Sequence, residues 1–162
     1  MKTRTIYQLA RAVAETLAHA HELQAAFESA TGRAAAVHLG AIGTEVVDNP
    51  RYPYIVVTPS EESADDASRT RTVSVHLAAR CDEGPGNDSD SSKPVAVNDV
   101  LDFGRGEVLV ELAETIVRLL RWAPVGSRLT GWSADYDFNT YPVQSVALRM
   151  EYTDEFSFSE EP

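Results

Sequence analysis

Histidines are the side chains in this sequence best suited to acid–base or metal chemistry, and they are scattered along it. They are His19, His21, His38 and His76. His19 and His21 lie two residues apart on a predicted helix, and this spacing directs their side chains away from each other. His76 falls on the polar face of a predicted strand, where we expect it to be solvated. The spacing of the histidines therefore predicts no metal centre and no general base.

The single cysteine, Cys81, is followed directly by Asp82 and Glu83. Nearby carboxylates disfavour the thiolate form, so this sequence context argues against a nucleophilic cysteine. One cysteine also excludes an internal disulfide framework and a zinc site built from several cysteines. We therefore interpret Cys81 as a structural or incidental residue.

Two further segments contain only part of a ligand-binding motif. Asp88 and Asp90 begin like a calcium-binding loop, but the sixth loop position is Lys93, where that motif needs glycine. Gly104 and Gly106 precede a predicted helix, but the third glycine of a dinucleotide-binding fingerprint is missing. We therefore expect no cofactor, no metal ion and no catalytic residues, and we hypothesise that the protein is not an enzyme.

Composition narrows the classes of partner. The chain has 162 residues, with 25 acidic and 14 basic residues and a formal net charge of −11. This balance argues against broad binding of nucleic-acid phosphates and against docking on an anionic membrane. The length predicts a single domain over 1–162. The sequence shows no signal-peptide pattern, so we expect the protein in the reducing cytoplasm of the cell that makes it.

The first third of the chain predicts a long helix over 4–31. Its apolar residues recur every three or four positions, which places them on one face. Thr3 or Thr5 is the expected cap at its start, and Gly32 is the expected stop. The apolar residues of this face are Ile6, Leu9, Ala10, Val13, Leu17, Ala20 and Leu23.

Strand patterns follow Gly32. Short strands are expected at 37–39 and 45–47, and a buried strand at 52–58, ended by Pro59. The acidic run 61–66 is interpreted as a solvated loop. Residues 70–80 alternate between apolar and polar side chains, which predicts a strand with one exposed face.

The second half of the sequence predicts a mobile acidic loop, a helix and two strands. The loop covers 82–94, because nothing there can bury apolar surface. The helix carries apolar residues at 109–120 and ends at Pro124. The strands 128–138 and 143–153 are expected to pair antiparallel, since only four residues connect them. The tail 155–162 is expected to fray, which leaves 4–156 as the ordered core.

These elements predict the fold class α+β, with a mostly antiparallel β-sheet and two main helices packed on one face. The residues expected in the core are Val73, Val75, Leu77, Leu112, Ile116, Val146, Leu148 and Met150.

The order of elements resembles a known family. The opening helix, the strands at 52–58 and 71–77, the helix around 112–116 and the closing strand 141–154 are similar to tail terminator proteins of long-tailed bacteriophages. These are also called tail completion or minor tail proteins and include the gpU-like group. The resemblance covers 4–156 and lies in the order of the elements and their general sequence character.

The resemblance implies a structural protein of the virion. Its subunits would form a homo-oligomeric ring, a hexamer, at the head-proximal end of the tail, after assembly in the host cytoplasm. The ring would cap the tail tube protein and offer a surface to the head–tail connector protein. DNA would pass through the bore without sequence-specific binding, and an acidic lining would keep the duplex from adhering. The expected contact residues are Asp82, Glu83, Asp88 and Asp90.

Other classes stay open at this point. The chain could be a head–tail connector or baseplate subunit, or an acidic module that binds a host protein. It could also be a small enzyme whose catalytic residues are dispersed along the sequence. A closed ring of identical subunits would favour the phage family, whereas a deep pocket with several titratable groups would favour the enzyme.

Overall fold

Two 13-residue strands, β3 (Ser68–Arg80) and β7 (Val143–Glu155), form the centre of the sheet. They pair antiparallel along their whole length, from Ser68 opposite Glu155 to Arg80 opposite Val143. Each strand alternates apolar and polar residues, so one face of the pair is a continuous apolar row. The antiparallel pairing predicted for the two closing strands is also confirmed, since β6 (Arg128–Asp137) pairs with β7.

The computed structural model describes residues 5–40, 51–80, 95–97, 100–102, 106–122, 126–140 and 142–156. Over these residues the main sheet has five strands in the order β1-β2-β3-β7-β6, and only the β1–β2 pair is parallel. The remaining main strands are β1 (Ala36–Leu39) and β2 (Tyr54–Ala64). Two short strands, β4 (Val95–Val97) and β5 (Val100–Asp102), pair only with each other.

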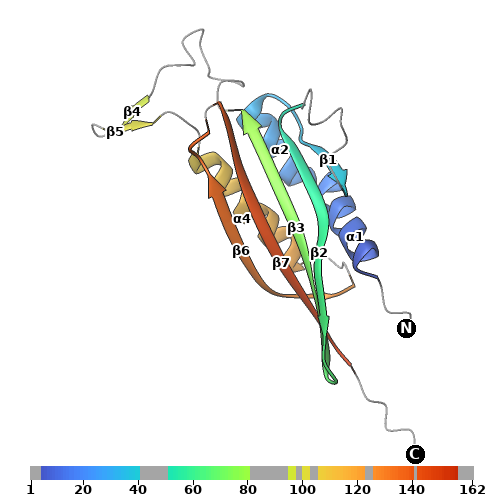
Figure 1. The fold of residues 1–162 in the computed structure, drawn as a ribbon. Helices are drawn as coiled ribbons and strands as arrows, with labels where there is room; N and C mark the ends of the chain where they lie inside the picture. The colour runs from blue at the N-terminus through green and yellow to red at the C-terminus, as the bar shows by residue number, and fades with distance from the viewer. Residues whose placement is uncertain are drawn as a thin grey trace, which may run out of the picture.

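Three described helices cover one face of the sheet: α1 (Ile6–His19), α2 (His21–Thr31) and α4 (Gly106–Trp122) (Figure 1). The other face of the sheet carries no described helix. The predicted α+β class, with helices packed on one face of a mostly antiparallel sheet, is confirmed.

The expectation of one continuous helix over 4–31 is wrong, because the helix is interrupted at Ala20. The ψ angle of Ala20 is 99°, which is extended. The Gln24 side chain donates to the carbonyl of Leu17, and its amide oxygen accepts from the backbone of Ala35. The first bond compensates for a helical bond lost at the break, and the second connects α2 to the segment that leads into β1. A straight helix over this range would be about 42 Å long, whereas two helices bury both Leu17 and Leu23 in the core.

The ends of the first two helices follow local sequence signals. Thr5 caps α1 and forms a reciprocal capping box with Gln8. Gly32 ends α2 with a φ of 84°, a left-handed conformation that glycine adopts without steric cost. Both residues were predicted in these roles.

The expectation that a strand ends at Pro59 and gives way to a loop at 61–66 is also wrong. Strand β2 continues to Ala64, with a register shift between Pro59 and Glu61. Proline is tolerated there because β1 pairs only as far as Val57, which leaves this part of β2 at a sheet edge. The acidic residues beyond it remain exposed although they lie in a strand.

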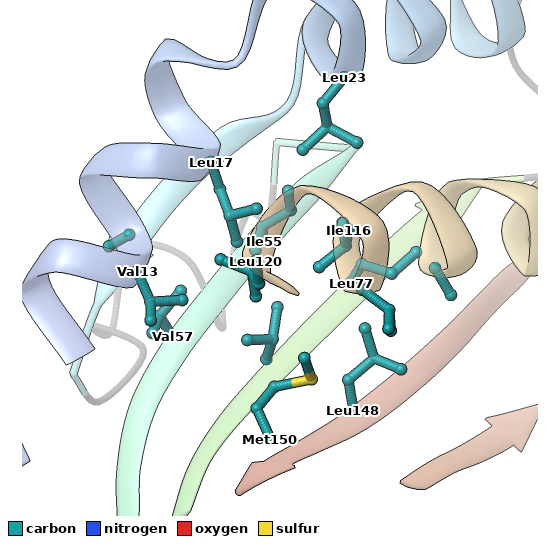
Figure 2. Packing of buried hydrophobic residues seen from close by; sticks show 14 of the residues in the cluster. Val13, Leu17, Leu23, Ile55, Val57, Leu77, Ile116, Leu120, Leu148 and Met150 are labelled. Carbon is teal, nitrogen blue, oxygen red and sulfur yellow. The ribbon is translucent and has the colours of Figure 1, made fainter. Parts of the chain in front are cut away.

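The core lies between the helices and the sheet (Figure 2). Val13 and Leu17 of α1 pack toward β2, and Ile116 and Leu120 of α4 pack over the middle strands. All eight predicted core residues are buried, at most 3% exposed. The alternation and the helical spacing were therefore sufficient to place them.

Several predicted features lie outside the described residues. They are the strand at 45–47, Cys81, the loop 82–94 with Asp82, Glu83, Asp88 and Asp90, Gly104, Pro124 and the tail 157–162.

A substitution at Leu148 measures how much the central strand β7 contributes to the stability of the fold. Leu148 is 1% exposed, and Leu148→Ala should lower the free energy of unfolding by about 2–5 kcal/mol, because it removes buried apolar atoms and leaves a cavity. Urea unfolding measures this change. The control is Asp135→Ala on exposed β6, expected within about 0.5 kcal/mol of the parent. Equal effects of the two substitutions would contradict the burial of this face.

Candidate interaction surfaces

One end of the sheet, where β2, β3 and β7 continue, extends past the helices (Figure 1), and the first residues of β6 pair with β7 at its base. It consists of residues 60–72, which include the turn between β2 and β3, together with residues 151–156 at the end of β7; we call it the arm. The arm contains seven acidic residues and two arginines, so it carries −5 of the formal net charge of −11. Almost half of the acidic excess therefore lies in this segment.

A buried guanidinium lies at the base of the arm, on the helix side of the sheet. Arg71 is only 1% exposed. Its Nη1 lies 3.2 Å from Oδ2 of Asp154, and its Nε lies 3.5 Å from Oε2 of Glu62. A second arginine, Arg69, lies 3.8 Å from Glu62 through its Nε. Two carboxylates from the flanking strands therefore compensate two arginines of β3.

The contacts of the Arg71 guanidinium are ion pairs without well-aligned hydrogen bonds. None of its three guanidinium nitrogens has a well-aligned hydrogen-bond acceptor in the part of the chain that the structure describes. The hydroxyl of Tyr152, on the residue opposite Arg71 in the ladder, is likewise buried. Burial raises the pKa of Tyr152 far above its ordinary value, so the phenol stays neutral. The attraction between Arg71 and the two carboxylates is the main electrostatic contact here.

A second ion-pair group lies on the opposite face of the same strands. Arg149 Nη2 lies 2.6 Å from Oε2 of Glu61, and its Nε lies 3.8 Å from Oε1 of Glu151. Thr72 sits between Glu61 and Glu151 in the cross-strand row and is 3% exposed. The register shift after Pro59 is what directs Glu61 to this face and Glu62 to the helix face.

The tip of the arm is closed by a carboxylate-capped turn. Oδ1 of Asp65 accepts from the backbone N–H groups of Ala67 and Ser68, at 2.8 and 2.7 Å. These hydrogen bonds hold the pKa of Asp65 below its usual range. Phe156 donates its backbone N–H to Ala67, and the guanidinium of Arg69 lies 5.9 Å from the Phe156 ring. The end of β7 is thereby fastened to the turn.

A second surface is the outer edge of β6. No described strand pairs with this edge. Trp132 and Tyr136 lie on its helix side and are 44% and 42% exposed. The ring of Phe138 follows them, 5.5 Å from that of Tyr136. The edge thus combines unpaired backbone groups with exposed aromatic rings.

The open face of the sheet has an apolar patch at the end away from the arm. Tyr54, Val56 and Ala78 are buried there, and the rings of Tyr54 and Tyr52 lie 5.3 Å apart. His76 lies 6.2 Å from Tyr54, ring to ring, and is half-buried, so the expectation of a solvated His76 is wrong. Burial lowers the pKa of His76 and favours the neutral imidazole.

The other histidines stay apart from any such cluster. His19 ends α1 and His21 begins α2, one on each side of the break, and both are exposed. His38 lies on β1 and is half-buried. Across the described ranges no three His, Cys, Asp or Glu side chains are grouped so as to hold a metal ion.

The groove between α2 and α4, about 590 Å³ in volume, lacks paired titratable groups. Among the described residues that line it, Glu111 is the only ionisable one, beside the hydroxyls of Ser29 and Thr115.

Neither the arm nor the β6 edge was predicted from the sequence. One signal for Arg71 was present: it is two residues before Val73, in phase with the apolar row of β3. A charged residue in such a row requires a countercharge. The carboxylates that supply it come from other strands, so no local pattern reveals them.

No protein-family model matches the chain, and no match is found among curated proteins. Among the described helices, none is long and apolar enough to cross a membrane.

The Asp154→Asn variant tests the charge pairing at the base of the arm. Removing the carboxylate charge leaves Arg71 buried with less compensation, so the free energy of unfolding should fall by about 1.5–3 kcal/mol. The matched control is Glu61→Gln, which breaks the exposed ion pair on the other face and should barely move the urea midpoint. A change below about 0.5 kcal/mol for Asp154→Asn would mean that other groups neutralise Arg71.

Low pH should weaken the hydrogen bonds of the turn at the tip of the arm. Because the folded-state pKa of Asp65 is lowered, its contribution is complete above the unfolded-state pKa, near 4, and is lost as pH falls through the folded value. The amide signals of Ala67 and Ser68 should shift together in that range in an NMR titration. Asp65→Asn should abolish the shift. A titration at the ordinary pKa would show that the turn bonds do not form in solution.

Proposed function

We propose that this protein is a non-catalytic structural subunit that forms a ring, the tail terminator of a long-tailed bacteriophage. The observation that carries the proposal is the arm: an acidic projection held in shape by ion pairs on both faces. It stands on a small α+β body with helices on one face of the sheet.

The charge distribution supports different roles for different surfaces of the subunit. The arm concentrates acidic residues, and its tip exposes Asp65, Asp66 and Glu155. Like charge repels the DNA backbone within about 8 Å at physiological salt, so only acidic groups close to the bore have an effect. We infer that the arm faces the bore or its rim, while less charged surfaces join neighbouring subunits.

A ring places a symmetry demand on the subunit. Each subunit must present two different surfaces that fit each other, and the rotation between subunits must close. Six copies would cap the last ring of tail tube protein and offer the opposite side to the head–tail connector. Because a ring contact needs no ligand, the subunit would work without a cofactor.

The alternative is an acidic module that binds a host protein, favoured by the same exposed arm. A binding module of this kind would not need to form closed rings. Electron microscopy of the purified protein separates the two. Closed rings of one size support the terminator, and monomers or dimers without closed rings support the module.

Loss of the gene provides the functional test. Without a terminator, tube polymerisation has no stop and heads have no surface to join, so the phage should yield tails of abnormal length or unattached tails. Tail lengths and infectious titre measure this. Normal infectious particles after deletion would exclude the proposed function.

The role of the acidic arm can be tested separately from ring formation. The double variant Asp66→Lys and Glu155→Lys reverses two exposed charges while leaving the buried pairs of Arg71 in place. Rings and tail lengths should be normal, whereas infectious titre should fall at least tenfold because DNA adheres in the bore. The control variant, Asp66→Asn with Glu155→Gln, should have a smaller effect. Equal titres for all three proteins would place the arm away from the DNA.

A further inference from the structure

The two exposed edges of the main sheet differ in how they are guarded against pairing. Beyond β1, the outer edge of β2 carries Pro59, a register shift, and the carboxylates of Glu61 and Glu62. These are the devices by which proteins prevent edge strands from associating. Edge strand β6 has no proline, its only register shift lies near its start, between Leu129 and Gly131, and its carboxylates, Asp135 and Asp137, lie on the open face. Its helix-side row, Trp132, Ala134 and Tyr136, carries no charge, so this edge is the less protected of the two.

Side chains on β6 alternate in a way that suits a partner strand. Trp132, Ala134 and Tyr136 lie on the helix side, opposite core residues of β7. Ser133 and Asp135 lie on the open side. A partner strand must therefore offer apolar groups on one face and tolerate carboxylates on the other.

We propose that β6 pairs antiparallel with β6 of a second copy, with the two-fold axis at Ala134. The dimer would join two five-stranded sheets across this edge. It is independent of the tail function, since either a ring subunit or a binding module could form it as the free protein. A two-fold contact uses the same surface twice and cannot by itself generate a six-membered ring.

The register follows from the side chains. A two-fold axis through the sheet keeps each residue on its own face, so Ala134 opposite Ala134 sets Trp132 opposite Tyr136 twice. Cross-strand aromatic pairs of this kind stabilise sheets. On the open face, Asp135 then lies opposite Ser133, and no carboxylate meets another.

Neighbouring registers are poorer. Centring the axis on Asp135 would place two carboxylates face to face, which is destabilising. Centring it on Tyr136 would set Asp135 opposite Asp137. Centring it on Ser133 would pair Trp132 with Ala134 and remove both aromatic pairs. The sequence of β6 thus favours the register centred on Ala134 over those centred on Ser133, Asp135 and Tyr136.

Cross-linking reads the register directly. In a Cys81→Ser background, Ala134→Cys places two thiols across the axis, at the Cα separation of about 4.5–5.5 Å found between paired strands. Oxidation should give a covalent dimer in high yield. The matched control is Asp135→Cys, whose two copies lie beyond the about 7 Å over which a disulfide forms. A dimer linked equally well by both, or by neither, would overturn the proposed register.

Charge substitutions at Ser133 test the same contact without a cross-link. Lysine at 133 faces Asp135 of the partner, and aspartate at 133 repels it. Because the pair occurs twice, Ser133→Lys should tighten the dimer and Ser133→Asp weaken it, each about two- to thirty-fold, in sedimentation equilibrium. Ala25→Lys and Ala25→Asp, on an exposed position of α2, make the same change in net charge away from β6 and should have little effect.

The aromatic pairs give a third measurement. Trp132→Ser with Tyr136→Ser should remove the dimer over the concentrations tested while circular dichroism and the urea midpoint stay close to those of the parent, since both rings are exposed in the subunit. A parent protein that is monomeric at high concentration would refute the proposal. So would larger assemblies that persist in the double variant, since these would use another surface. Neither result would bear on the tail function, which the phage deletion tests.

Discussion

The burial of one positive charge constrains half of this structure. Arg71 lies in the apolar row of β3 and is almost fully excluded from water, so it needs negative charge close by. Glu62 supplies it from β2 and Asp154 supplies it from β7. Both strands must therefore extend at least to the level of Arg71, and the register of β2 must shift after Pro59 to turn Glu62 inward. The arm is the structural consequence of compensating this charge.

The prediction from sequence succeeded where the signal was local. Period-two alternation located β3 and β7, and helical spacing located α4 and the core, because these patterns report which face is buried. It failed where the decisive partner was distant in sequence. The acidic run after Pro59 has the composition of a loop, but it continues the ladder with β3, and its carboxylates contact Arg69, Arg71 and Arg149 of other strands.

The break at Ala20 was hidden for a related reason. No glycine or proline marks it, and alanine has the highest helix propensity. What compensates for the break is the Gln24 side chain, which bonds to Leu17 and to Ala35 at once. The same limit applies to the interaction surfaces. A search for clustered chemical groups emphasised Asp82 and its neighbours, whereas the arm and the β6 edge become visible only when strands are placed side by side.

The two surfaces make different demands on assembly, and this difference relates the two proposals. A ring joins unlike surfaces, so it can grow only when each subunit has both of them free. A dimer through β6 joins like surfaces and leaves the arm of each copy exposed at its own end of the sheet. If the ring contact includes the β6 edge, the dimer must dissociate before assembly, and its stability sets the concentration of competent subunits. If the ring contact lies elsewhere, the dimer would add a second copy outside every subunit of the ring. Either assembly can form without the other, so the oligomeric state of the free protein and the formation of rings have to be measured separately.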